Sequence, residues 1–160
     1  MASLADLPLK YRLLMRSYPY RSVDWRPGAV LNKPLSEARI AAITTAAFYA
    51  PDQTPFDESI RGGDVSFRTI PLDTDLRTLA IAHRSDAFDH TGIEADRNLA
   101  LPLDRLKELT RSRLIGSAAA CHFSFMGSVP APGRLISGTA PDVARLLREG
   151  GVDAVLLTPV

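Results

Sequence analysis

The chain has 160 residues, of which 46% are hydrophobic and 23% charged, so length and composition indicate one globular domain of ordinary size. Its 19 basic and 18 acidic side chains nearly cancel, which gives no basic face that would favour nucleic acid as a partner. Apolar runs stay well short of the roughly 20 residues of a membrane span, and the first ten residues lack a secretion-signal pattern. We therefore expect a cytoplasmic protein with no membrane partner.

The N-terminal third predicts one helix and one buried strand. Residues 9–17 place leucines on one side of a helix, which the pair Tyr18-Pro19 ends. Residues 24–34 are interpreted as an irregular linker, with Trp25 as a packing anchor. Residues 38–45 are continuously apolar, a pattern typical of a parallel-sheet strand that is buried on both faces.

The middle of the chain predicts a long loop and two strands. Residues 46–64 contain two prolines and two glycines, and ordered loops of this length often carry function. Residues 65–70 alternate between apolar and polar side chains and predict an edge strand. Residues 79–83 predict a second short buried strand.

The C-terminal third continues the alternation of helix and strand. Residues 102–111 carry leucines at helical spacing, and 114–120 predict a third apolar strand. Thr139 is the expected N-cap of the last helix, Gly150 and Gly151 end it, and residues 152–158 form the closing strand. The sequence predicts a single α/β domain over residues 1–160, a three-layer sandwich with a mainly parallel, Rossmann/flavodoxin-like sheet.

The end of the chain stands where active-site residues would be expected to follow. In open α/β sheets, ligands bind beyond the carboxyl ends of the strands, and the last predicted strand runs into Thr158-Pro159-Val160. We expect the chain to be the incomplete N-terminal part of a longer protein. A sheet cut at its last strand would expose apolar surface, which favours association. The alternative is a domain that simply ends in a strand.

The segment after the second buried strand holds the strongest candidate residues. His83, Ser85 and Asp86 follow a strand end, the usual place for catalytic groups, and His122 follows the third predicted strand. The alternative interpretation is a loop that satisfies its own backbone and a structural histidine. Cys121, the single cysteine, is interpreted as a buried and inert thiol at the end of its strand.

Two further groups of residues are candidates for substrate binding. Arg61, Gly62 and Gly63 could form a turn whose amides and guanidinium hold an anion, or a plain tight turn. Asp89 and His90 extend the cluster that begins at His83. A metal site among these histidines and aspartates is conceivable, but the spacing matches no standard motif and we predict no metal.

Several blocks together resemble the selenoprotein B family of glycine, sarcosine, betaine and D-proline reductases. The likeness covers nearly the whole chain and rests on the combination of blocks. The blocks are RGGD (61–64) with SFR (66–68), HRSDAFDH (83–90), EADRN (94–98), HFSFMGS (122–128) and GVDAVLLTPV (151–160).

The resemblance implies a reductive enzyme in which a selenolate attacks a carbon that bears an activated amine. A selenol resembles a thiol of low pKa, so it is ionised and strongly nucleophilic at neutral pH. The resemblance also implies that a selenocysteine follows Val160 directly in the full-length protein, encoded by a UGA codon. No cofactor is expected within residues 1–160, and this truncated chain is expected to be inactive alone.

The partners that follow from the resemblance are a small amine or amino-acid-like substrate and the other subunits of a reductase complex, or a homo-oligomer. Two other functions stay open. One is a non-catalytic α/β domain that binds a small anion or a partner subunit. The other is a metal-dependent hydrolase, which would have to gather its histidines and carboxylates from one crowded loop.

Overall fold

The computed structural model describes residue 5 and residues 8–17, 28–85 and 88–160. Two compact units are present, residues 1–30 and residues 31–160. The first contains helix α1 (Leu9–Ser17), which confirms the predicted helix. The predicted roles of residues 18–27, Trp25 among them, lie outside the described residues, whereas residues 31–34 have no helix or strand.

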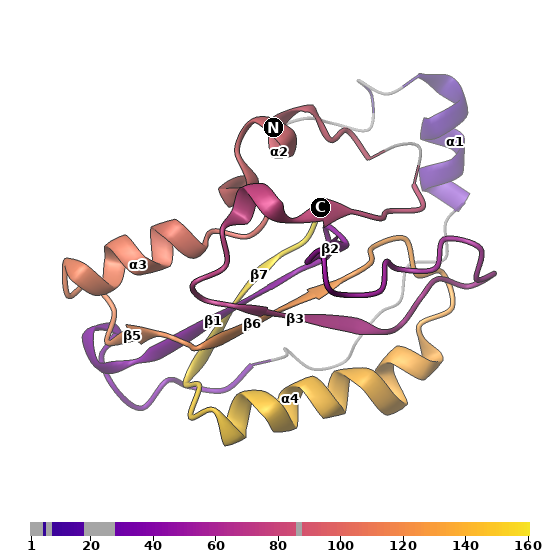
Figure 1. The fold of residues 1–160 in the computed structure, drawn as a ribbon. Coiled ribbons are helices and arrows are strands. Elements are labelled where there is room, and N and C mark those ends of the chain that lie inside the picture. Colours follow the sequence, from indigo (N-terminus) through magenta and orange to yellow (C-terminus); the bar gives the residue numbers. More distant parts are fainter. Residues whose placement is uncertain (1–4, 6–7, 18–27, 86–87) are drawn as a thin grey trace. The chain divides into compact units, whose positions relative to one another are not determined.

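A five-stranded sheet built around β1 (Arg39–Thr44) forms the centre of the second unit (Figure 1). β1 pairs in parallel with β5 (Ser117–Ala118), β6 (Cys121–Phe125) and β7 (Ala154–Thr158). β3 (Phe67–Pro71) pairs antiparallel with β6 at an edge. The predicted buried strand and edge strand are therefore confirmed, and the sheet is mixed.

Helices lie on both sides of this sheet (Figure 1). α3 (Leu103–Arg111) packs Leu103 and Leu106 into the main core with Ile40 and Ala42 of β1. α4 (Ala140–Glu149) lies against the opposite face. A short helix α2 (Thr91–Ala95) and the 3₁₀ turns Leu35–Glu37, Leu76–Thr78 and Arg97–Leu99 complete the α3 side. This confirms the α/β class, but a Rossmann/flavodoxin-like three-layer sandwich is not confirmed.

Several predicted boundaries in the second half are wrong. The strand expected at 79–83 is only β4 (Ala80–Ile81), half-exposed and paired antiparallel with β2 (Phe48–Tyr49) in a separate small sheet. The strand expected at 114–120 is only β5, because the ladder breaks and restarts as β6 at Cys121. The thiol of Cys121 is accordingly exposed, which corrects the expectation of a buried cysteine.

The start of the last helix also differs from the prediction. Thr139 has helical backbone angles and caps nothing, because a π-helical segment (Leu135–Thr139) already precedes α4. The predicted end is confirmed, since Gly151 adopts a φ of +65°, which glycine takes without strain.

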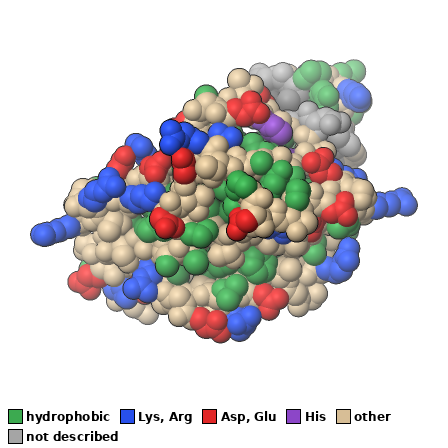
Figure 2. Space-filling model, in the orientation of Figure 1, with side chains coloured by type: hydrophobic (Ala, Val, Ile, Leu, Met, Phe, Trp, Pro, Cys, Tyr) green, Lys and Arg blue, Asp and Glu red, His purple; other side chains and the backbone are tan. Residues whose placement is uncertain are grey.

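The surface mixes charges and leaves one apolar edge. On the face in Figure 2, acidic and basic side chains are interspersed around a central group of hydrophobic side chains. Within the described chain β7 pairs only with β1, and its Val155, Leu156 and Leu157 are exposed. Among the described residues there is no helix with the length and apolar character needed to cross a membrane.

Candidate functional site

The carboxyl ends of β1, β6 and β7 meet at one edge of the sheet, where His83 joins them. The backbone amide of Gly127 donates to the carbonyl of Thr45 (2.9 Å). The Thr45 hydroxyl is 3.2 Å from the carbonyl oxygen of Val160 and accepts from the Val160 amide at 3.0 Å. A Cβ atom on Gly127 would stand 2.6 Å from Nε2 of His83 and 3.4 Å from the Val160 carbonyl oxygen. The four residues therefore form one contiguous group, which we call the carboxyl-edge site.

The hydrogen bonds of His83 define which ring nitrogen carries its proton. Nδ1 accepts the backbone amide of Ser85 at 3.1 Å, so in the neutral imidazole the proton is on Nε2. Nε2 is buried and has no hydrogen-bond partner among the described residues. A buried donor without an acceptor is costly, which makes this N–H group a candidate for binding an acceptor.

The surroundings of His83 favour the neutral form of its ring. Burial lowers the pKa of His83 below its ordinary value, the neighbouring His90 lowers this pKa further, and Glu58 opposes both effects. The ring lies 4.5 Å from Phe88, which in turn lies 4.5 Å from the ring of His90, centroid to centroid. At neutral pH His83 is therefore a hydrogen-bond donor without a charge, and its ring lies against the tilted ring of Phe88.

The structure does not bring all the candidate residues of the loop after His83 to the carboxyl-edge site. The Nε2 atom of His90 is also buried and has no hydrogen-bond partner among the described residues. Asp89 is exposed, and its carboxylate accepts the Thr91 amide at 2.9 Å, just before α2. Asp86 lies outside the described residues. The roles assigned to Ser85, Asp86, Asp89 and His90 stay predictions.

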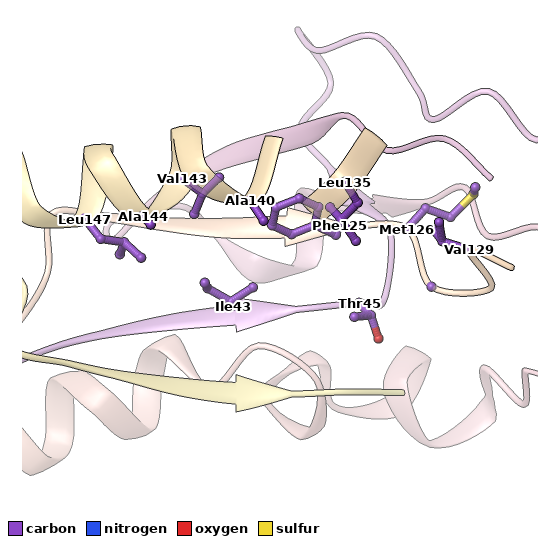
Figure 3. A pocket seen from close by; sticks show the side chains of 11 residues that line it. Ile43, Thr45, Phe125, Met126, Val129, Leu135, Ala140, Val143, Ala144 and Leu147 are labelled. Carbon is purple, nitrogen blue, oxygen red and sulfur yellow. The ribbon is translucent and has the colours of Figure 1, made fainter. Parts of the chain in front are cut away.

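An apolar hollow adjoins the carboxyl-edge site between the sheet and α4 (Figure 3). Its volume is about 440 Å³, which is within the range of small-molecule pockets. Thr45 and Gly127 belong to both the hollow and the carboxyl-edge site. The sequence interpretation missed Thr45, Gly127 and the hollow, because it ended the third strand at residue 120 whereas β6 runs to Phe125.

His122 lies in a different environment from His83. β1 pairs with β5 up to Ile40 and with β6 from Ile43 onward, so the ladder has a gap between Ile40 and Ile43. In this gap the backbone amide of Ala42 donates to Nδ1 of His122 at 2.9 Å. The imidazole replaces a missing backbone acceptor in the ladder. Burial lowers the pKa of His122 to about 4, so the ring is neutral at physiological pH. This geometry gives Nδ1 of His122 a structural role. Its Nε2, like that of His83, is buried and has no hydrogen-bond partner among the described residues, and the predicted catalytic role of His122 stays a prediction.

The Arg61-Gly62-Gly63 segment forms a tight turn. The amides of Gly62 and Gly63 both donate to the carbonyl of Ile60, at 2.9 and 3.1 Å. These amides are therefore already occupied, and Arg61 is exposed. Arg84 ties the turn to the His83 loop, because its guanidinium donates to the same Ile60 carbonyl at 2.7 Å. An anion-binding role for Arg61, Gly62 and Gly63 stays a prediction.

Cys121 lies away from the carboxyl-edge site. Cys121 lines a second pocket with Arg39 and Gly150, at the amino-terminal edge of the sheet and so at the opposite end of β6 from Gly127. Within residues 5, 8–17, 28–85 and 88–160, no group of three or more His, Cys, Asp or Glu side chains could hold a metal ion.

Curated proteins that are similar in sequence to this chain are subunits of amino-acid reductases. The D-proline reductase subunit gamma of Acetoanaerobium sticklandii is 31% identical over 84% of this chain and 52% of its own length. The glycine reductase complex component B subunit gamma of Symbiobacterium thermophilum is 29% identical, over 88% of this chain and 33% of its own. The sarcosine reductase complex component B subunit beta of Peptoclostridium acidaminophilum is 26% identical, over 88% and 32%.

The chain spans about half the length of the first of these relatives and about a third of the other two. No family model matches the sequence. No solved structure matches it with significance.

Proposed function

We propose that this chain, a sequence relative of the selenoprotein B-like family of reductase subunits, is the part of such a subunit that positions substrate and nucleophile for reductive carbon–nitrogen cleavage. The observation that carries the proposal is the buried Nε2–H donor of His83, which faces Gly127 at the carboxyl-edge site. The substrate would be a small amine or amino acid, of the kind represented by glycine, sarcosine, betaine and D-proline.

The proposed role of His83 is to donate a hydrogen bond to a negatively charged partner. Preorganised donors in a water-poor site stabilise charge strongly, because they need no reorganisation when the charge develops. The charge would be a substrate carboxylate or the selenolate or thiolate nucleophile. A selenocysteine that directly follows Val160 would begin beside the Thr45 hydroxyl, which already holds both the amide and the carbonyl of Val160.

We further propose that residues 1–160 alone do not turn over substrate. Cys121 is the only thiol of the chain, and it lines the pocket at the other edge of the sheet from His83. A nucleophile has to lie within contact distance of the reacting carbon, so this thiol is poorly sited for the reaction. Dithiol-dependent consumption of glycine, sarcosine, betaine or D-proline by the isolated chain would contradict this.

The alternative function is binding of a small anion or a partner subunit without covalent chemistry. The same N–H of His83, which has no hydrogen-bond partner among the described residues, supports it, because an N–H donor binds an anion whether or not a bond is broken. The two functions differ in what His83 variants lose. In the binding function, a His83→Gln change alters affinity alone; in the reductase function, it also lowers kcat.

The experiment uses the natural protein that carries this sequence, assembled with its native partner subunits and supplied with a dithiol reductant. Substrate consumption is compared among the wild type, His83→Gln and the exposed control Arg77→Gln. The proposal predicts a loss of about tenfold to a hundredfold in kcat for His83→Gln and no loss for the control. Equal kcat values in all three proteins would overturn the proposed role of the carboxyl-edge site.

A further inference from the structure

The apolar hollow beside the carboxyl-edge site has a wall made almost wholly of hydrocarbon. Strands β1 and β6 form its floor, α4 its roof, and the loop and π-helical segment before α4 its mouth (Figure 3). Its volume is about 440 Å³. It is lined by Ile43, Thr45, Phe125, Met126, Gly127, Val129, Leu135, Ala140, Val143, Ala144 and Leu147.

The hollow is unsuited to charged groups. Among the described residues that line it, Thr45 alone carries a polar side chain. Its hydroxyl points away from α4 (Figure 3) and is engaged by the backbone of Val160. A charged group placed in this hollow would lose its water without gaining a partner, whereas a hydrocarbon group would be stabilised by leaving water.

The hollow and the buried donor of His83 share a boundary. Gly127 lines the hollow, and the absence of a side chain on Gly127 is what allows Nε2 of His83 to approach it. Thr45 lines the hollow and supplies the carbonyl that accepts the Gly127 amide. A ligand whose apolar body fills the hollow would therefore have its polar end at the carboxyl-edge site.

We infer that the hollow binds the hydrocarbon body of the substrate, and that the substrate class is an amine or amino acid with a ring or branched chain. This inference rests on the proposed function. It narrows the proposed substrate class from small amines and amino acids in general to those larger than glycine that carry a ring or a branched chain. A hydrocarbon pocket gains about tenfold or more in affinity from the apolar groups that fill it. Molecules that have the charged end alone gain nothing from the hollow.

The test uses two probes that carry the same charge, cyclopentanecarboxylate and acetate, titrated into the full 160-residue chain. The methyl groups of Ile43 and Val143 report occupancy of the hollow by NMR. Cyclopentanecarboxylate is expected to shift both methyl signals and to bind at least about tenfold more tightly than acetate. Acetate is expected to leave these methyl signals in place.

Variants link the binding to the hollow. Ala144→Phe fills the hollow from α4, and Leu135→Asp places a charge at the mouth of the hollow. Each substitution is expected to remove the tenfold preference for cyclopentanecarboxylate over acetate. Ala95→Phe, at an exposed position of α2, is the matched control and is expected to keep it. The second hollow variant decides the result if Ala144→Phe does not fold.

Two results would overturn the inference, and both leave the proposed function to its own assay. Equal affinity for the two probes without methyl shifts would mean that anions bind at the edge and the hollow stays unused. Absence of binding by both probes would mean that the hollow is not a ligand site. The comparison of kcat between wild type and His83→Gln is independent of these outcomes, so failure of the hollow and failure of the reductase function remain distinguishable.

Discussion

Nε2 of His83 lies 2.6 Å from the point at which a Cβ atom on Gly127 would stand. Because real Cβ atoms do not tolerate such a contact, Gly127→Ala has to displace the imidazole from the carboxyl-edge site. The displaced group is the end of a side chain, so we expect a loss of only about 1 kcal/mol in the free energy of unfolding. Chemical denaturation measures this, and the NMR signals of the His83 ring should change strongly.

Gly116→Ala is the matched comparison for that substitution. A Cβ atom on Gly116 would collide with the backbone of Glu37 and Ala38, and backbone cannot swing aside as a side chain does. We expect this variant to lose about 3 kcal/mol or more, while its His83 signals stay unchanged if it folds. Equal destabilisation by the two substitutions would mean that the imidazole of His83 cannot move aside as a side chain is expected to do.

His122 gives the stability of the chain a predicted pH dependence. Its pKa is lowered to about 4 in the folded state by burial, against an ordinary value of 6.5. Below pH 6.5 the unfolded chain therefore takes up a proton that the folded chain does not, and the free energy of unfolding falls as the pH falls toward 4. The integrated loss is about 3 kcal/mol. Urea unfolding at a series of pH values between 7 and 4 measures it.

Two substitutions test whether His122 causes this pH dependence: His122→Gln, and Cys121→Ser at the neighbouring exposed position as the control. His122→Gln keeps an acceptor for the Ala42 amide but removes the titrating group, so its stability should change less over this range. Cys121→Ser should keep the full dependence of the wild type. If the His122→Gln variant shows the same slope as the wild type, another group is responsible.

Helix α3 is predicted to be held mainly by its buried leucines. Leu106 is 2% exposed and contacts the main core, so Leu106→Ala should lower the free energy of unfolding by about 2–5 kcal/mol. Leu99 is 64% exposed, and Leu99→Ala should cost less than about 0.5 kcal/mol. Similar losses for the two variants, measured by chemical denaturation, would show that burial at Leu106 is not what stabilises the helix.

The parts of the fold that could be predicted from sequence are those with a single dominant pattern. The run at 38–45 is apolar on both faces because β1 lies at the centre of the sheet, and the leucine spacing of 102–111 reports the buried side of α3. The run at 114–120 misled the prediction, because apolar character does not reveal that the ladder breaks and restarts at Cys121. The start of the last helix was mispredicted for a similar reason. Thr139 is a good capping residue by type, but a π-helical segment already precedes α4, so Thr139 is not at a helix start.

The candidate site could be predicted only in part, for a comparable reason. A histidine after a strand was a local signal, and His83 does lie at the carboxyl edge of the sheet. Thr45 and Gly127 became site residues only through pairing between strands far apart in sequence. His122 has the same local signal as His83, but its ring is buried and fills a gap in the strand pairing of β1, where it accepts the Ala42 amide.

The most direct test of the account is reductase turnover by the natural, fully assembled protein with His83 changed to glutamine. The account predicts that kcat for the preferred amine substrate falls by about tenfold to a hundredfold, while the unfolding transition and the activity of the Arg77→Gln control stay at wild-type values. A His83→Gln protein that turns over substrate at the wild-type rate would contradict the central claim that the carboxyl-edge site carries the chemistry.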